Sequence, residues 1–219
     1  MTHAQRMEAF EKTDLYVVIT GAYCAGRSPL EVLDACLRAG VRLIQFREKE
    51  MEDGPCYALG HAFREKTREA GALLIVDDRV DIALAIEADG VHLGQDDLPV
   101  DAARRIAPEL IIGASSHNLD EALTAQAAGA SYVNIGPIFS TQTKTVPTGK
   151  VGTEMLDTIR PHLEIPSTCM GGIKAHNIDE VLAHGARRVA VVTAVTAAPD
   201  VEAAARELRD KIRTHWNAT

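Results

Sequence analysis

The 219-residue chain is long enough for one large α/β domain or two small ones, and its 46% of hydrophobic residues suffices for a sizeable buried core. The formal net charge of −8 excludes an overall basic surface of the kind that binds nucleic acid. The chain begins without a basic flank and apolar run, and no apolar stretch reaches the ~18 residues that span a bilayer. We therefore expect a cytoplasmic protein without nucleic-acid or membrane partners, whose four cysteines are reduced packing residues.

The predicted elements begin with an extension at residues 1–14, in which residues 4–10 have a helical pattern. Eight short, β-rich apolar runs follow. They are too short for helices between their breakers, and several are nearly continuous in apolar residues, as strands buried on both faces are. These predicted strands cover residues 15–20, 42–47, 72–77, 90–94, 110–116, 132–136, 166–172 and 188–193.

Helix signals separate the strands. Ser28 and Pro29 supply a capping side chain and a proline at the first helical position, and Asn118 and Asn177 each precede an acidic first turn. A glycine stands just before several strands, where a helix C-cap and the turn after it favour a left-handed conformation. These glycines are Gly40, Gly71, Gly129 and Gly185.

Three stretches resemble one another: AGVRL (39–43), AGASY (128–132) and HGARR (184–188), each ending a helix and starting a strand. A strand–helix unit of roughly 20–30 residues repeated eight times predicts a closed barrel. The fold class is therefore α/β, a single (β/α)8 TIM barrel over residues 1–219. An open, doubly wound sheet is the alternative, but no Gly-x-Gly-x-x-Gly follows the first strand.

Polar residues follow the second strand, and in such barrels the carboxyl ends of the strands carry the chemistry. Strand alternation places Gln45, Arg47 and Lys49 on one side, and Phe46 and Glu48 on the other. Two cations and an amide on one side are suited to binding an anion, with Arg supplying a bidentate fork. A solvated charge cluster at a strand end is the alternative interpretation.

Acidic residues follow the third and fourth strands. Asp77 and Asp78 end the third strand, and Asp97 comes shortly after the fourth. Carboxylates at neighbouring strand ends repel one another unless a cation bridges them, and Mg2+ bound by one or two carboxylates plus substrate phosphates fits. Helix N-capping by Asp78 and Asp97 is the alternative.

The later strand ends carry hydroxyl groups and glycines. Ser115 and Ser116 are candidate phosphate donors, with His117 beside them as a base or an orienting group. The irregular stretch 138–151 is long enough to be functional, and its Thr141, Thr143 and Lys144 are suited to a diphosphate. Paired glycines after the seventh strand and small residues after the eighth match the phosphate site common in these barrels, although the glycines alone would also make a tight turn. These residues are Gly171, Gly172, Val192 and Thr193.

Five blocks in order now form a recognisable set: QFREK (45–49), DDRVDIA (77–83), GVHLGQDDLP (90–99), GPIF with TQTK (136–144) and GGI (171–173). This set resembles the thiamine phosphate synthase family over residues 15–197. The resemblance implies a transferase that joins 4-amino-2-methyl-5-hydroxymethylpyrimidine diphosphate to 4-methyl-5-hydroxyethylthiazole phosphate, with Mg2+ as cofactor. It implies small phosphorylated substrates as partners. A homo-oligomer stays open, because the amphipathic faces of the predicted helices do not reveal whether they pack against another subunit.

The resemblance also assigns roles by position. It implies that Asp78 and Asp97 are the Mg2+ ligands. It implies a pyrimidine diphosphate pocket lined by Gln45, Arg47, Lys49 and Asp77, and contacts to the diphosphate from Ser115 and Lys144. The thiazole phosphate is then held by Thr141, Thr143, Gly171, Val192 and Thr193. The catalytic residues are expected to be Arg47, Lys49, Ser115 and Lys144.

Two positions depart from the family pattern. Asp77 stands where the family usually has Asn, and Phe46 stands where it has Leu. The extra carboxylate could strengthen Mg2+ binding, alter contact with the pyrimidine or shift specificity.

Three other functions share this fold. A thiazole tautomerase would use His117 as acid and base, but such relatives lack the paired acids and the TQTK loop. A non-catalytic barrel that senses thiamine precursors would use the same pocket without turnover. A generic phosphate-binding isomerase would not need the acid pair.

Overall fold

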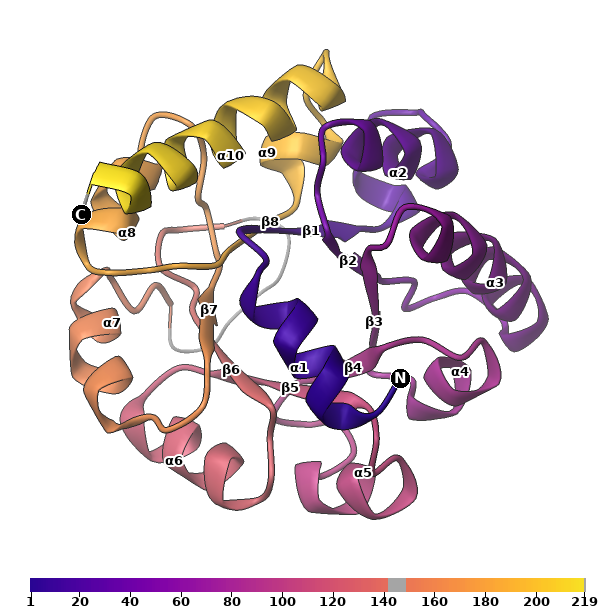
Figure 1. The fold of residues 1–219 in the computed structure, drawn as a ribbon, viewed down its shortest axis with the longest axis horizontal. Helices are drawn as coiled ribbons and strands as arrows, with labels where there is room; N and C mark the ends of the chain where they lie inside the picture. Colours follow the sequence, from indigo (N-terminus) through magenta and orange to yellow (C-terminus); the bar gives the residue numbers. More distant parts are fainter. Residues whose placement is uncertain (142–148, 219) are drawn as a thin grey trace.

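Eight short parallel strands pair in chain order, and the last pairs with the first to close a barrel (Figure 1). The structure is a computed structural model that describes residues 1–141 and 149–218. All eight predicted strands are present, and the closing β1–β8 pair excludes the open sheet. The strands are β1 (Leu15–Ile19), β2 (Leu43–Phe46), β3 (Leu73–Asp77), β4 (Gly90–Leu93), β5 (Ile111–Ser116), β6 (Tyr132–Ile135), β7 (Ser167–Cys169) and β8 (Val189–Val191).

Helices surround the barrel as an outer ring (Figure 1). After α1 (His3–Glu11) they are α2 (Pro29–Arg38), α3 (Asp53–Glu69), α4 (Val80–Ala85), α5 (Val100–Ile106), α6 (Leu119–Ala127), α7 (Glu154–Ile159), α8 (Ile178–Ala183), α9 (Thr193–Thr196) and α10 (Val201–Ala218), with short 3-10 turns η1 (Gly21–Tyr23) and η2 (Arg160–His162). The predicted start signals of α2 and α6 are confirmed, because the Ser28 and Asn118 side chains accept hydrogen bonds from backbone N–H groups of the first turn. Asn177 precedes α8 but does not cap it with its side chain.

The three similar stretches share a contact as well as a turn. Gly40, Gly129 and Gly185 all have positive φ angles, as a left-handed C-cap requires. An arginine side chain donates to a carbonyl at each turn: Arg209 to Ala39 O at 2.6 Å, Arg104 to Gly129 O at 3.0 Å and Arg160 to His184 O at 2.7 Å. The repeats therefore mark helix C-termini whose otherwise unpaired carbonyls accept from a cation.

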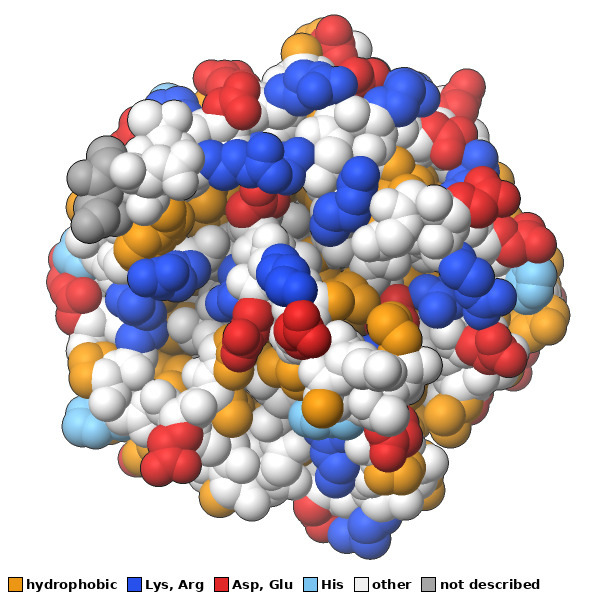
Figure 2. Space-filling view, viewed as in Figure 1, with side chains coloured by type: hydrophobic (Ala, Val, Ile, Leu, Met, Phe, Trp, Pro, Cys, Tyr) orange, Lys and Arg blue, Asp and Glu red, His pale blue; other side chains and the backbone are white. Residues whose placement is uncertain are grey.

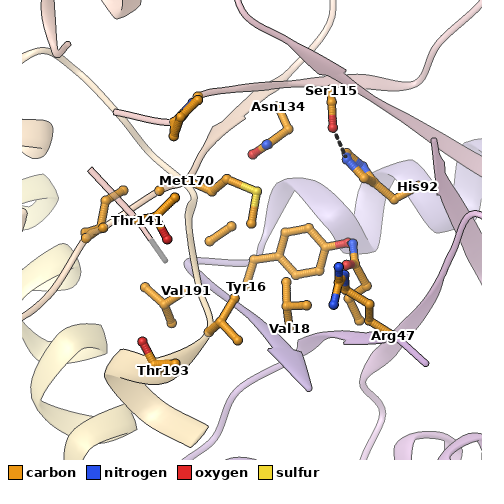
Figure 3. A pocket seen from close by; sticks show the side chains of 18 of the residues that line it. Tyr16, Val18, Arg47, His92, Ser115, Asn134, Thr141, Met170, Val191 and Thr193 are labelled. Carbon is orange, nitrogen blue, oxygen red and sulfur yellow. Dashed lines mark hydrogen bonds between the residues drawn. The ribbon is translucent and has the colours of Figure 1, made fainter. Parts of the chain in front are cut away.

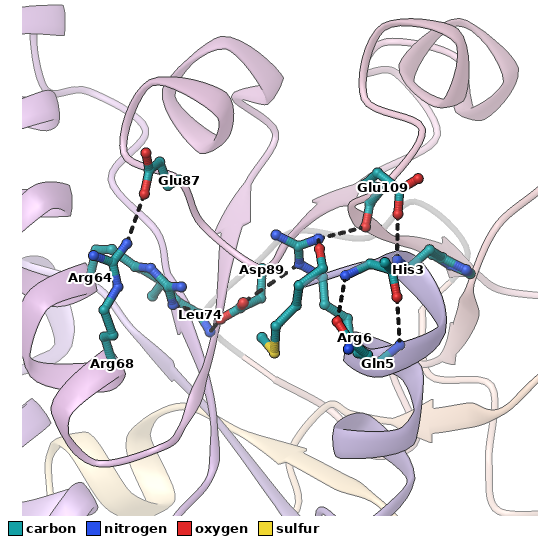
Figure 4. A network of polar contacts seen from close by, with 11 residues as sticks. His3, Gln5, Arg6, Arg64, Arg68, Leu74, Glu87, Asp89 and Glu109 are labelled. Atoms are coloured by element: carbon teal, nitrogen blue, oxygen red, sulfur yellow. Dashed lines mark hydrogen bonds and ion pairs between the residues drawn. The ribbon is translucent and has the colours of Figure 1, made fainter.

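The N-terminal extension, whose helical pattern left its structure open, forms α1, which crosses the end of the barrel where the strands begin (Figure 1). Its Phe10 is fully buried and stacks on Tyr132 inside the barrel, with ring centroids 4.8 Å apart. Arg6 of α1 reaches the buried Asp89, which also pairs with Arg64 of α3 at 2.8 Å (Figure 4). Acidic and basic side chains are interspersed on this face (Figure 2).

Two apolar clusters hold the fold together. The larger one lies between the strands and the outer helices, and it includes all four cysteines, which are buried and free. The smaller one fills the barrel interior around Phe10, Tyr16 and Tyr132. Among residues 1–141 and 149–218, no helix combines the length and apolarity needed to cross a membrane.

Candidate active site

A cavity of about 660 Å³ opens at the carboxyl ends of the strands, opposite α1, and residues in or just after every strand line it (Figure 3). Most of the predicted site residues line this cavity. They are Gln45, Arg47, Lys49, Asp77, Asp78, Ser115, Thr141, Gly171, Val192 and Thr193. Asp97 is not among the lining residues, and Thr143 and Lys144 lie outside the described residues.

The cationic side of the cavity follows β2, as alternation predicted. Gln45, Arg47 and Lys49 face the cavity, whereas Phe46 packs outward and Glu48 accepts a hydrogen bond from Gly21 N–H at 2.7 Å. Lys49 Nζ lies 2.6 Å from Asp78 Oδ2. The two cations are therefore part of a mixed charge cluster that extends from β2 to β3.

Asp77 is the most deeply buried acid of this cluster. Its Oδ2 lies 3.2 Å from Arg47 Nε and 3.8 Å from Lys49 Nζ, but it accepts a hydrogen bond from neither. Burial and the neighbouring Asp78 raise the pKa of Asp77 to about 7, against the opposing effect of Lys49 and Arg47. The charge at position 77 is thus only partly compensated by the protein itself.

Asp78 follows β3 and Asp97 follows β4, and the two acids lie close enough for Asp78 to act on the pKa of Asp97. Burial and the Asp78 carboxylate both raise the pKa of Asp97, which accepts a hydrogen bond from Gly94 N–H at 2.6 Å. Neither acid caps a helix, because the cap residues of α4 and α5 are Arg79 and Pro99. The capping alternative is therefore wrong for both.

Carboxylate oxygens in this pair are the donors that Mg2+ prefers. In the part of the chain that the structure describes, no cluster brings together three or more His, Cys, Asp or Glu side chains suited to a metal. A cation held by Asp78 and Asp97 would therefore need further oxygens from a ligand or water, as Mg2+ sites at phosphates commonly have.

The opposite side of the cavity is built from backbone. β7 ends at Cys169, shortly before Gly171 and Gly172. Their φ angles of 106° and 63° are ones that other residues rarely adopt. A side chain at Gly171 would overlap Pro137, so only glycine fits beside this loop. Val192 and Thr193 begin α9 directly after β8, and Thr141 lines the same cavity.

Ser115 and His117 lie at the end of β5. Ser115 Oγ lies 2.9 Å from His92 Nε2 (Figure 3). His117 lines the cavity, but its Nδ1 is 2.8 Å from Glu121 Oε2, which also accepts from the His117 backbone N–H at 2.8 Å. His117 is thus tied to the first turn of α6.

Several cavity residues were not predicted: Tyr16, Asn134 and Met170 line its floor, and His92 was given no role. Tyr16 and Asn134 face the barrel interior rather than following a strand. Alternation could have marked Tyr16 and Tyr132 as inward-facing, but their height in the barrel depends on strand register. Gly113 in the middle of β5 was a second signal in the sequence, because a strand residue without a side chain indicates that a large neighbour needs the space. In the sheet, Gly113 lies opposite Tyr132.

A closed (β/α)8 barrel with a cavity lined by several charged side chains at the carboxyl ends of its strands defines a barrel enzyme. The family model described as thiamine monophosphate synthase matches residues 15–195. The chain belongs to this family, and it is a transferase of thiamine biosynthesis.

Individual relatives support the same assignment. A thiamine-phosphate synthase of Chloroflexus aurantiacus is 47% identical over 89% of this chain and 90% of its own length. One of Moorella thermoacetica is 48% identical over 91% of this chain and 95% of its own. The solved structure of thiamine phosphate pyrophosphorylase from Pyrococcus furiosus superposes with a TM-score of 0.87 at 40% identity, covering 93% of this chain and 97% of that one.

Proposed function

We propose that the enzyme joins 4-amino-2-methyl-5-hydroxymethylpyrimidine diphosphate to 4-methyl-5-(2-phosphoethyl)thiazole, giving thiamine phosphate and diphosphate, with Mg2+ as cofactor. The observation that carries the proposal is the juxtaposition of Asp78 and Asp97 beside Lys49 and Arg47. Two neighbouring carboxylates beside two cations suit a bound metal ion together with a polyanionic leaving group.

The acid pair fits Mg2+ on charge and donor chemistry. Asp78 and Asp97 would hold the ion, and their mutual repulsion, which raises the pKa of Asp97, would be relieved by it. Bound Mg2+ would supply positive charge to the diphosphate as it departs.

The reaction needs neither a covalent nucleophile nor a strong base. The bond between the pyrimidine methylene carbon and the diphosphate oxygen breaks, and the thiazole nitrogen forms the new bond to that carbon. The pyrimidine amino group can donate electrons to the carbon, so a carbocation-like path fits. Arg47 and Lys49 would bind the diphosphate as its charge grows, and Ser115 would donate a hydrogen bond to it.

The thiazole phosphate would bind at the opposite side of the cavity. Gly171, Val192 and Thr193 offer backbone N–H groups and a hydroxyl there, and Thr141 lies on the same side. Holding this substrate by its phosphate orients its nitrogen toward the methylene carbon. Thr143 and Lys144 belong to the same proposal through the resemblance of their loop, which we expect to exclude water.

A steady-state assay with both substrates tests the proposal. Thiamine phosphate and diphosphate should form in equal amounts with Mg2+, and formation should stop with excess EDTA. Asp78→Asn should lower turnover by about 100-fold or more, because the Mg2+ that would stabilise the departing diphosphate loses one of its carboxylate ligands. Asp101→Asn is the matched control, since Asp101 forms an exposed pair with Arg105 on α5. Full turnover in EDTA, or substrate binding without any product, would overturn the proposal.

A further inference from the structure

A row of hydrogen-bonded side chains lies under the cavity, drawn from five different strands. Gln45 Nε2 donates to Tyr16 OH at 2.7 Å, and the hydroxyls of Tyr16 and Tyr132 lie 3.1 Å apart. Tyr132 OH lies 2.9 Å from His92 Nδ1, and His92 Nε2 lies 2.9 Å from Ser115 Oγ. The row begins and ends at residues that line the cavity, Gln45 and Ser115.

The amide at one end gives the row a direction. Its NH2 group can only donate, so Tyr16 accepts there and has its own proton to give to Tyr132. Tyr132 then donates its proton to His92 Nδ1, which must be the unprotonated nitrogen of a neutral imidazole. His92 Nε2–H therefore donates to Ser115 Oγ, and the Ser115 proton is left to point elsewhere.

The surroundings keep the two tyrosines protonated and in place. Burial raises the pKa of Tyr16 and of Tyr132, so both hydroxyls keep their protons. Phe10 stacks on the Tyr132 ring from below, and His92 stacks on it with centroids 5.6 Å apart. A methyl group at Gly113 would overlap the Tyr132 ring, so glycine in β5 is what lets the ring lie across the barrel.

We propose that Tyr16, Tyr132 and His92 are positioning residues that fix the polarity of the two ends of the row. Gln45 presents its carbonyl oxygen to the cavity as an acceptor, and Ser115 presents its hydroxyl as a donor. An amino-substituted heteroaromatic ring is then favoured at Gln45, and an anionic oxygen at Ser115. The inference rests on the proposed function for the identity of the substrate, and it explains how that substrate is oriented.

The tautomer of His92 tests the direction of the row in the unmodified enzyme. A two-bond proton–nitrogen correlation spectrum of histidine-labelled protein should show a protonated Nε2 and a bare Nδ1 at His92. Ligand-free protein suffices, so the result does not depend on the proposed reaction. A protonated Nδ1 would overturn the inference.

Two variants then separate the two ends, with dissociation constants measured for two probes. The pyrimidine alcohol, 4-amino-2-methyl-5-hydroxymethylpyrimidine, reports on the Gln45 end, and inorganic diphosphate with Mg2+ reports on the Ser115 end. Tyr16→Phe should raise the dissociation constant of the pyrimidine alcohol about tenfold, because Gln45 loses its partner. It should raise that of diphosphate less than about twofold, because the Tyr132 hydroxyl can still donate to His92. Tyr132→Phe should do the reverse, because the Gln45 amide still donates to Tyr16.

Tyr57→Phe is the matched control, since Tyr57 is exposed on α3, and it should change neither constant. If the tyrosines were merely structural, each variant would bind both probes more weakly to a similar extent. That result would overturn the inference, and so would unchanged dissociation constants in both variants. If the phenylalanine variants do not fold, the His92 tautomer decides. If wild-type enzyme forms no thiamine phosphate but the two probes split as described, the proposed function fails and the positioning roles stand.

Discussion

At the scale of single residues, the cavity combines groups that the protein alone does not fully pair. Asp77 Oδ2 is buried without a hydrogen bond, and Asp78 has Lys49 as its cation at 2.6 Å. A buried carboxylate without full compensation is costly in a folded protein. Such a cost is accepted most readily where a ligand or metal completes the site.

Lys49→Gln should raise KM for the pyrimidine diphosphate by about tenfold and lower kcat, because a charge-assisted contact to the leaving group is lost. KM for the thiazole phosphate should change little, since that substrate is proposed to bind on the opposite side. Initial-rate kinetics with each substrate varied in turn measure both constants. Lys66→Gln is the control, because Lys66 pairs with Asp34 outside the cavity. Equal rises in both KM values would contradict separate subsites.

Gly113→Ala should destabilise the fold by about 1–3 kcal/mol, because the added methyl group overlaps the Tyr132 ring in a filled barrel. Urea denaturation measures the free energy of unfolding. Gly54→Ala is a matched control in α3, where an added methyl group meets no atom within 4 Å. That control should be neutral or stabilising by up to about 1 kcal/mol, since alanine is the better helix former. Equal stability of the two variants would show that the ring moves aside freely.

At the scale of elements, α1 serves the barrel as a plug at the end opposite the cavity. Phe10 enters the barrel interior, and Arg188 of the segment before β8 donates to Phe10 O at 3.0 Å and to Glu11 O at 2.7 Å. The helix is therefore held by both an aromatic contact and the pairing of its terminal carbonyls. Since Phe10 also supports Tyr132, α1 contacts the row of side chains beneath the cavity.

Phe10→Ala should cost about 3–5 kcal/mol of stability, the range for removing a fully buried aromatic side chain. Chemical denaturation against wild type measures the loss. Leu123→Ala provides the comparison, because Leu123 is partly exposed on α6 and its truncation should cost less than about 1 kcal/mol. A loss at Phe10 no larger than at Leu123 would mean that α1 is peripheral to the barrel.

At the scale of the whole molecule, the sequence predicted what depends on local pattern. Apolar runs between glycine and capping signals located all eight strands, and chemistry-bearing residues such as Arg47, Asp78 and Ser115 were found because they lie at the ends of those strands or directly after them. The roles of Tyr16 and Tyr132 could not be read in this way. They meet because β1 and β6, 116 positions apart at these residues, place them at one height in the barrel, and register is a property of the closed sheet.

A partly buried carboxylate lies at the seam where the barrel closes. Asp14, just before β1, accepts from Arg209 Nε at 2.9 Å and from Arg213 Nε at 2.8 Å, both on α10, and its backbone carbonyl accepts from Val189 N–H of β8 at 3.1 Å. Arg209 continues to the Ala39 carbonyl at the end of α2. Asp14 thus links β1 to α10 at the seam where the first and last units meet, beside the backbone pairing of β1 with β8.

Burial would raise the pKa of Asp14, but its hydrogen bonds from Arg209, the Leu15 N–H and Arg213 outweigh burial and lower it below the ordinary 3.8. A lowered pKa means that the carboxylate contributes stability at every pH above its unfolded value, and that this contribution is lost as the pH falls through the lower folded value. Asp14→Asn should therefore be about 2–4 kcal/mol less stable than wild type at pH 7, because Arg209 loses a nearly buried counter-ion. As the pH falls from about 4 through the lower folded pKa, the gap should shrink, since wild-type Asp14 becomes protonated as well.

Urea denaturation of both proteins across this pH range measures the gap. Asp101→Asn, which removes an exposed acid of α5, should track wild type throughout. If the Asp14→Asn gap instead stayed constant or widened on acidification, the seam would depend on the shape of this side chain and not on its charge. Closure of the barrel would then be a matter of packing between β1, β8 and α10 alone.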